Sequence, residues 1–204
     1  MRITAIKPRR KQLSAVFIDG EEAVLLDTRT LLENRVDVGR ELDDDELKAL
    51  IDLSNENRAK EKALWLISSR SHSKKELTDK IRRTSTPEAA QKAADRMEEL
   101  GLINDEDFAR RYADKLIFTK KMSKRAAAME LRRKGIDREI IDETLDAIEA
   151  DPREQIHDFL LKKYKDLSDE KTKRRAAAAL QRLGYGWEDI RAAMAQFGSD
   201  DELY

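Results

Sequence analysis

The hydrophobic pattern of this chain changes after its first quarter, from short alternating runs to helical spacing. Over most of the length, apolar side chains recur every three or four positions, which predicts amphipathic helices. Gly101, Gly135 and Gly184 each follow such a run, where a left-handed residue commonly closes a helix. Asn104 and the pair Asp151-Pro152 are typical helix starts. The pattern therefore predicts a mainly helical chain.

The N-terminal segment is different, because short β-type runs replace the helical spacing. LSAVFI (13–18) and EAVLLD (22–27) flank Asp19-Gly20, and Asp-Gly between two such runs predicts a hairpin with a type I′ turn. With a third run, RITAI (2–6), we expect a sheet of two or three strands. The pattern that follows predicts two short helices, over 28–34 and 43–54.

One helical segment occurs three times in nearly the same form. MSKRAAAMELRRKGI (122–136) and KTKRRAAAALQRLGY (171–185) match without a gap when Gly135 is placed on Gly184, a period of 49. Fifty residues before the second copy, HSKKELTDKIRR (72–83) repeats the basic pair and the apolar positions, without the following Gly. Helices are expected before each copy, over about 57–69, 105–117 and 153–164, and after it, over about 87–100, 137–149 and 187–197.

A three-helix unit of this size cannot bury its apolar face alone, so neighbouring units are expected to stack. The predicted fold is mainly α: three tandem three-helix (helix-turn-helix-like) repeats in a curved elongated array, preceded by a small N-terminal subdomain that contains the β-hairpin. The expected boundaries are 1–53 for the N-terminal subdomain, 54–103, 104–150 and 151–198 for the three repeats, and 199–204 for a tail.

Composition narrows the possible functions. Charged residues make up 41 % of the chain and aromatic residues 5 %, which fits thin, serially connected helical cores. The chain has no Cys, and its two His lie far apart, so no thiol nucleophile or zinc site is expected. No phosphate-binding loop, nucleophile elbow or HExxH motif is present. We expect a non-enzymatic protein with no catalytic residue, no cofactor and no bound metal.

The termini and the net charge give further expectations. MRITAIKPRRK lacks the apolar core of a signal peptide, and no window approaches the length of a transmembrane helix. We therefore expect a cytoplasmic protein, a monomer without membrane contact. The net charge of −1 indicates nothing about a nucleic-acid partner, so the distribution of charge has to be considered instead.

Basic residues recur on one face of the repeated helix. Ala127 and Leu131 share the buried side, whereas Arg125 and Arg132, seven residues apart, are expected to face outward. The corresponding residues are Lys75 and Arg82 in the first copy, and Arg174 and Gln181 in the third. Ordinary solvated helix faces would explain any single charge. The recurrence in three copies favours a basic strip that binds a partner, with phosphate-backbone or protein-filament contact fitting better than base-specific readout.

The aromatic residues and the histidines are not expected to form a binding site. Trp65 and Trp187 lie at helical spacing and are predicted to pack in the core. Aromatics do not interleave with the basic residues, as a stacking platform for single strands would require. His72 is expected to cap a helix or lie on the surface.

These motifs together resemble the RecX family, the bacterial modulators of the RecA recombinase. The resemblance rests on ALWLISSRSHSKKEL (63–77), ELGLINDEDFARRYA (99–113), SKRAAAMELRRKGID (123–137) and QRLGYGWEDI (181–190), and VFIDGEEAVLLD (16–27) is similar to the extension that some members carry. It covers essentially the whole chain, and ELGLINDEDFA is its most specific part.

The resemblance implies a non-catalytic regulator whose tandem units lie along the groove of the RecA–single-stranded-DNA filament. Family members block filament growth or promote disassembly, and damp ATP hydrolysis, strand exchange and coprotease activity, thereby modulating DNA repair, recombination and the SOS response. Single-stranded DNA is a further possible partner. The resemblance implies that the binding residues are Lys74, Lys75 and Arg82, then Lys124, Arg125, Arg132 and Arg133, then Lys173, Arg174 and Arg182.

Two alternatives stay open at the level of sequence. The first is a stand-alone DNA-binding helical-repeat protein that uses the same strip without a recombinase partner. The second is a general helical scaffold, for which neither DNA nor a recombinase is a ligand.

Overall fold

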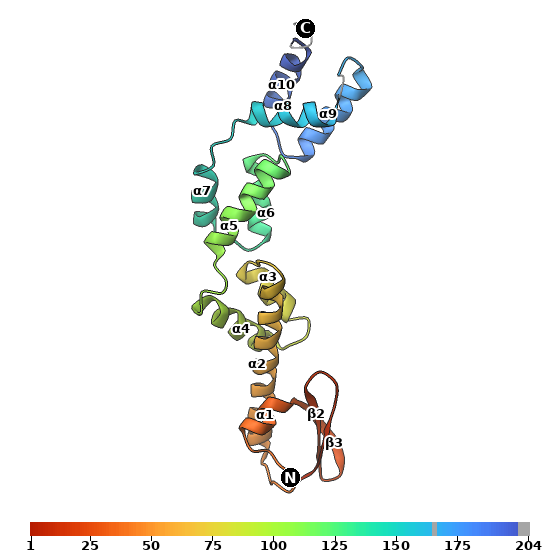
Figure 1. The fold of residues 1–204 in the computed structure, drawn as a ribbon, viewed down its shortest axis with the longest axis vertical. Helices are drawn as coiled ribbons and strands as arrows, with labels where there is room; N and C mark the ends of the chain where they lie inside the picture. The colour runs from red at the N-terminus through yellow and green to blue at the C-terminus, as the bar shows by residue number, and fades with distance from the viewer. Residues whose placement is uncertain (165–166, 200–204) are drawn as a thin grey trace. The chain divides into compact units, whose positions relative to one another are not determined.

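A computed structural model gives the fold (Figure 1), and it describes residues 1–164 and 167–199. Most of the predicted tail, residues 200–204, lies outside the described part. The chain divides into two compact units, the first spanning Met1–Ile103 and the second beginning at Asn104. The predicted fold class is confirmed: helices dominate, and a small antiparallel sheet lies at the N-terminus.

The N-terminal sheet has three antiparallel strands in the order β1-β2-β3. The strands span β1 (Ile3–Pro8), β2 (Leu13–Ile18) and β3 (Glu21–Asp27). Asp19 and Gly20 have φ values of 49° and 95°, as the expected type I′ turn requires. The short helix α1 (Thr28–Glu33) follows, and Ile3, Val16, Leu26 and Leu31 form the centre of a core with the start of the next helix.

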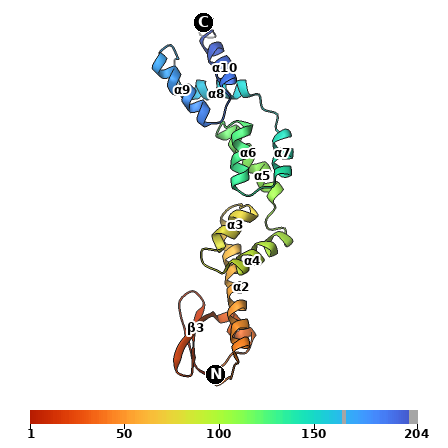
Figure 2. The ribbon, with the colours of Figure 1, turned by 180° about the vertical axis from the view of Figure 1, so that it is seen from behind.

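A single long helix, α2 (Asp44–Ser69), replaces the two helices predicted over 43–54 and 57–69. The polar stretch between the predicted helices does not break α2, because its side chains bond to the N-terminal subdomain. The Ser54 hydroxyl accepts a hydrogen bond of 2.8 Å from the Asp27 amide. The Asn57 amide donates to Thr30 Oγ1 at 3.0 Å. Both views show α2 extending from the sheet to the first repeat (Figures 1 and 2).

The first repeat continues with α3 (Lys74–Ile81) and α4 (Pro87–Glu99), which pack on the C-terminal half of α2. Ser73 and Thr86 cap these two helices through their side chains. The core is built mostly from small residues, with Ala59 and Ala63 of α2 against Ala90 and Ala94 of α4. Such small side chains allow close packing of the helices.

The second unit contains two further three-helix arrangements. The first comprises α5 (Asp105–Asp114), a short π-helix η1 (Lys115–Thr119), α6 (Lys124–Arg133) and α7 (Arg138–Asp146); the second comprises α8 (Pro152–Lys163), α9 (Glu170–Arg182) and α10 (Trp187–Ser199). Each has its own hydrophobic core. The predicted starts at Asn104 and Asp151 are confirmed as side-chain caps.

Burial supports the alignment of the three repeated helices. The two core positions of each copy are completely buried: Leu77 and Ile81 in α3, Ala127 and Leu131 in α6, and Ala176 and Leu180 in α9. Gly101, Gly135 and Gly184 have φ values between 66° and 90°, as expected of left-handed residues that end helices.

Within the second unit, the end of α9 packs against the start of α6. The Ser123 amide donates a 2.9 Å hydrogen bond to the Leu183 carbonyl. A Cβ added to Gly184 would lie 2.5 Å from Ala126 Cβ and 2.6 Å from Ser123 Oγ, so the glycine permits this approach. An ion pair of 2.8 Å between Lys121 and Asp158 adds a second link, and Lys121 lowers the pKa of that carboxyl.

Candidate partner-binding surface

The residues of the predicted basic strip face outward. Lys75 and Arg82 of the first copy, Arg125 and Arg132 of the second, and Arg174 of the third are all exposed. Gln181, which takes the place of an arginine in the third copy, is exposed as well. The opposite side of each helix packs in the core. The outward orientation predicted from the seven-residue spacing is therefore confirmed.

Ion pairs within the protein already neutralise part of the first copy. Lys74 Nζ lies 2.8 Å from Asp95 and 2.6 Å from Glu98, so this lysine ties α3 to α4. The pairing raises the pKa of Lys74, and it lowers the pKa of Asp95. Lys75 pairs with Asp79 one turn along the same helix, at 2.7 Å. These cations are less available to an anionic partner than the sequence indicates.

The other copies contain similar neutralised pairs beside unpaired cations. Arg133 lies 2.6 Å from Glu130, and Lys173 lies 3.3 Å from Glu170. Within the part of the chain that the structure describes, the predicted residues that have no carboxylate partner are Arg82, Lys124, Arg125, Arg132, Arg174 and Arg182. We call these six residues the unpaired basic set.

Three more exposed cations, two in α9 and one just after α3, were not in the predicted set. Arg83 corresponds to Arg133 in the repeat, and Lys171 and Arg175 lie on the first turns of α9. Among the described residues they have no ion-pair partner either. The signal that could have identified Arg83 is the Arg-Arg pair shared by the first two copies.

The two tryptophans are not in the core, contrary to the sequence-based prediction. Trp65 is 62 % exposed and Trp187 is 52 % exposed. In ALWLI, Ala63 and Leu66 face the core instead, so Trp65 points away from it. A cation lies near each ring: Lys62 Nζ is 4.1 Å and Arg191 Cζ is 6.0 Å from the respective ring centroid.

His72 is a buried residue, not the surface or capping residue expected from the sequence. Its exposed fraction is 2 %, and its Nδ1 lies 2.8 Å from the Arg70 carbonyl oxygen. The Lys80 ammonium donates to Nε2 at 3.1 Å, so Nδ1 carries the ring proton and donates to Arg70. Burial lowers the pKa of His72, and the ring is neutral at pH 7.

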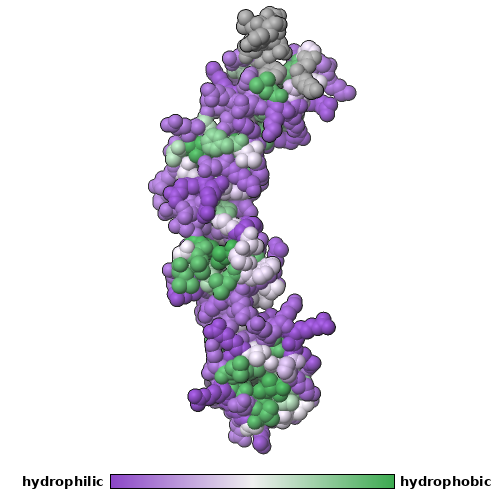
Figure 3. Space-filling model, viewed as in Figure 1, coloured by the Kyte–Doolittle hydropathy of each residue, from purple (hydrophilic) through white to green (hydrophobic). Residues whose placement is uncertain are grey.

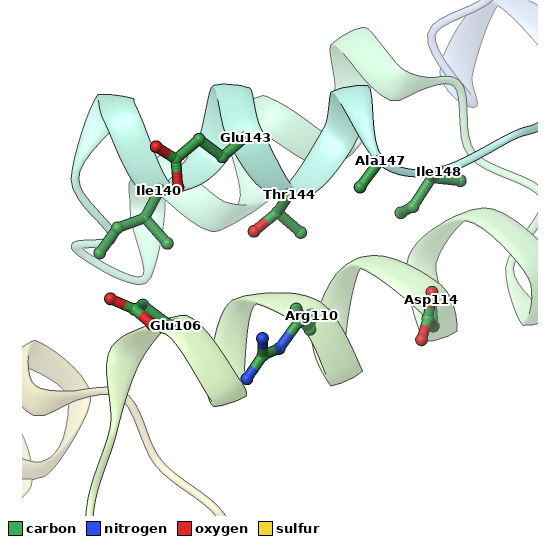
Figure 4. A pocket seen from close by; sticks show the side chains of 8 residues that line it. All are labelled: Glu106, Arg110, Asp114, Ile140, Glu143, Thr144, Ala147 and Ile148. Atoms are coloured by element: carbon green, nitrogen blue, oxygen red, sulfur yellow. The ribbon is translucent and has the colours of Figure 1, made fainter.

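Among the surface grooves of the second unit, two lie beside helices of the second repeat. One, of about 340 Å³, lies between α5 and the segment that contains α7 (Figure 4). It is lined on one side by Glu106, Arg110 and Asp114, and on the other by Ile140, Glu143, Thr144, Ala147 and Ile148. Arg110 borders it but pairs with Asp107. The other, of about 350 Å³, lies where α6 meets α8 and α10, and its lining includes Lys124, Arg125, Gln155 and Tyr185.

In the groove where α6 meets α8 and α10, Tyr185 donates a hydrogen bond to Gln155 Oε1 at 3.1 Å. Burial raises the pKa of Tyr185 to about 12, so its hydroxyl stays protonated at neutral pH.

Over residues 1–164 and 167–199, no group of three His, Cys, Asp or Glu side chains is placed to hold a metal ion. None of the helices searched in that part combines the length and apolarity needed to span a membrane. The face of the molecule seen in Figure 3 is mostly hydrophilic, with hydrophobic patches over the N-terminal subdomain and the first repeat and smaller ones over the second unit.

Two protein-family models match the second unit. Residues 104–145 match the model of the second three-helix domain of RecX, and residues 151–194 match that of the third. Two crystal structures of RecX proteins have the same fold at 20 % identity. One covers 95 % of this chain and 98 % of its own with a TM-score of 0.62. The other, from Lactobacillus salivarius, covers 71 % and 97 % with a TM-score of 0.56.

Curated relatives extend the match to almost the whole chain. The regulatory protein RecX of Bacillus velezensis is 31 % identical over 98 % of this chain and 80 % of its own length. That of Bacillus subtilis is 30 % identical over 98 % and 78 %. With this coverage and the two domain matches, the chain belongs to the RecX family of regulatory proteins.

Proposed function

We propose that this protein is a non-enzymatic regulator that binds the RecA recombinase, or its filament on single-stranded DNA, through the basic faces of α3, α6 and α9. The binding would restrain filament extension, ATP hydrolysis, strand exchange and coprotease activity, and so modulate DNA repair, recombination and the SOS response in the cytoplasm. Family membership and the resemblance stated above support a RecA-related role.

The observation that carries the proposal is the unpaired basic set, which has members in all three repeats. Arg82 and Arg132 take equivalent positions in the first two repeats, and Arg125 and Arg174 take equivalent positions in the second and third. A nucleoprotein filament is a polymer with repeating phosphate and protein surfaces, so a repeated cationic surface suits it. Each exposed cation without a carboxylate partner can neutralise a phosphate or an acidic side chain of the partner without first breaking an internal ion pair. We assign this role to Arg125 and Arg132 of α6 and to Arg174 of α9 above all.

The first test is a titration of ATP hydrolysis by the cognate recombinase on single-stranded DNA. Substoichiometric protein should lower the rate, because capping or disrupting a filament affects many recombinase subunits at once. An unchanged rate over the whole titration would refute the proposal.

Variants locate the surface. The triple substitution Arg125→Gln, Arg132→Gln and Arg174→Gln should raise the concentration needed for half-inhibition at least about tenfold, with unchanged circular dichroism, since all three residues are exposed. The matched control is Arg96→Gln, Arg110→Gln and Arg138→Gln, which removes the same charge from residues that lie outside α3, α6 and α9 and pair with carboxylates inside the protein. Equal effects of the two triple variants would show that net charge, and not the proposed surface, governs inhibition.

The alternative, DNA binding without a recombinase partner, draws on the same residues. It predicts direct binding to single-stranded DNA with an affinity that falls steeply as salt increases, together with no effect on the recombinase beyond competition for DNA. Inhibition that persists when DNA is in large excess over both proteins would rule that alternative out.

A further inference from the structure

Both tryptophans of this chain lie on the surface, one in each compact unit. Trp65 lies in the second half of α2, and Trp187 is the first residue of α10. Burial of a large aromatic side chain stabilises a fold by about 1.5–3 kcal/mol, a gain that a mostly exposed ring forgoes. Trp is enriched among the residues that contribute most to binding at interfaces, so these two exposed indoles are candidate contact residues.

The surroundings of each ring indicate the chemistry of the partner. Lys62 and Arg191 lie one helical turn from Trp65 and Trp187, on the same helices, and each places its positive group near the ring. In the described part of the chain, neither cation has a carboxylate partner. Each site thus combines a flat aromatic surface with an available positive charge.

More cations lie near both rings. Arg58 precedes Lys62 by one turn of α2 and has no ion-pair partner among the described residues. Trp187 directly follows Gly186, which lines the groove that also contains Lys124 and Arg125. The residue before Trp187 in the chain therefore lines the same groove as two members of the unpaired basic set.

We propose that Trp65 and Trp187 are stacking sites for the bases of a single-stranded nucleic acid, with Lys62 and Arg191 placed to neutralise adjacent phosphates. A base offers a flat face to the indole, and its phosphate offers a negative charge to the cation. Bases within a duplex are already stacked, so the sites select single strands.

This inference rests on the proposed function, because the strand inside the filament is the expected ligand, but its test uses DNA without recombinase. The variants Trp65→Phe and Trp187→Phe each leave one indole as a fluorescent reporter. Addition of an oligothymidylate at low salt should quench both reporters. An abasic oligonucleotide of equal length and charge should quench neither, and the same oligonucleotide added to N-acetyltryptophanamide corrects for absorbance.

Affinity measurements test whether stacking contributes to binding. Trp65→Ala and Trp187→Ala should each weaken binding of the oligothymidylate by about five- to tenfold or more, as loss of a base-stacking contact does. Leu32→Ala and Leu161→Ala are the matched controls, because these side chains are 74 % and 59 % exposed but have no aromatic face. They should leave the affinity unchanged.

Several outcomes would overturn the inference. Equal quenching by the abasic strand would assign the signal to phosphate attraction, and quenching by the recombinase alone, with none by DNA, would make the rings protein contacts. Alanine variants that bind as the parent does would exclude stacking. If the stacking test fails but the protein still inhibits ATP hydrolysis by the recombinase, the proposed function is unaffected. Quenching and stacking without any effect on the recombinase refutes the proposed function alone.

Discussion

His72 shows how a single residue can be fixed by contacts that its sequence neighbourhood does not reveal. The imidazole is buried between the Arg70 carbonyl and the Lys80 ammonium, an arrangement that only the neutral ring satisfies. Protonation at Nε2 would bring two cations together and remove a hydrogen bond. The residue therefore couples folding of the first repeat to pH.

We predict that the free energy of unfolding decreases as the pH falls from 7 to 5. The pKa of His72 is lower in the folded protein than in the unfolded chain, so on acidification the unfolded chain binds a proton first and is favoured. Urea titrations at several pH values measure this dependence. His72→Gln should cost about 1–3 kcal/mol at pH 7 and flatten the profile between pH 7 and 5. A slope that persists in this variant would assign the dependence to groups other than His72.

At the scale of the elements, the sequence predicts the repeated helices well, but it predicts poorly which of their basic residues form ion pairs with carboxylates. The spacing of Leu77 and Ile81, and of their equivalents, identifies the buried face because the helical period is fixed by the backbone. By contrast, the ion pair between Lys74 and Asp95 joins residues of two different helices, so local spacing does not reveal it. The unpaired basic set therefore emerged only from the structure.

Two errors of interpretation have a common physical origin. ALWLI is apolar around the whole circumference of α2, so periodicity could not identify which side faces the core, and Trp65 was assigned wrongly. Ser54 and Asn57 look like a helix break because they are polar, yet they satisfy Asp27 and Thr30 of the N-terminal subdomain. The orientation of Trp65 and the continuity of α2 both depend on contacts with segments distant in sequence.

The junction between α9 and α6 yields a second prediction. Gly184→Ala should destabilise the second unit by about 3 kcal/mol or more, because its φ of 90° is unfavourable for alanine and the new methyl group would meet Ala126 and Ser123 at 2.5–2.6 Å. Gly101→Ala is the matched control: its φ is 66°, but nothing lies within 4 Å of the added carbon. It should cost about 1–2 kcal/mol. Similar losses for both variants in urea unfolding would show that the close approach is unimportant.

At the scale of the whole molecule, the described hydrophobic clusters are small and follow one another along the chain. Each consists mainly of residues from one repeat or from the N-terminal subdomain. Stability in such serial arrangements approximates a sum of local terms and interfaces between neighbours. Damage to one core should therefore remain largely local, and a partner-binding face on one repeat can be altered without unfolding the others.

Hydrogen exchange followed by mass spectrometry can test this locality. Leu131→Ala removes a completely buried side chain from the core of the second repeat, which should cost about 2–5 kcal/mol and accelerate exchange over residues 104–150. Leu77→Ala is the reciprocal variant in the first repeat and should accelerate exchange over 54–103 instead. If either substitution accelerates exchange uniformly over the chain, the protein unfolds as one cooperative body. Because the clusters are separate, we expect each variant to affect its own repeat most strongly and the neighbouring repeats less.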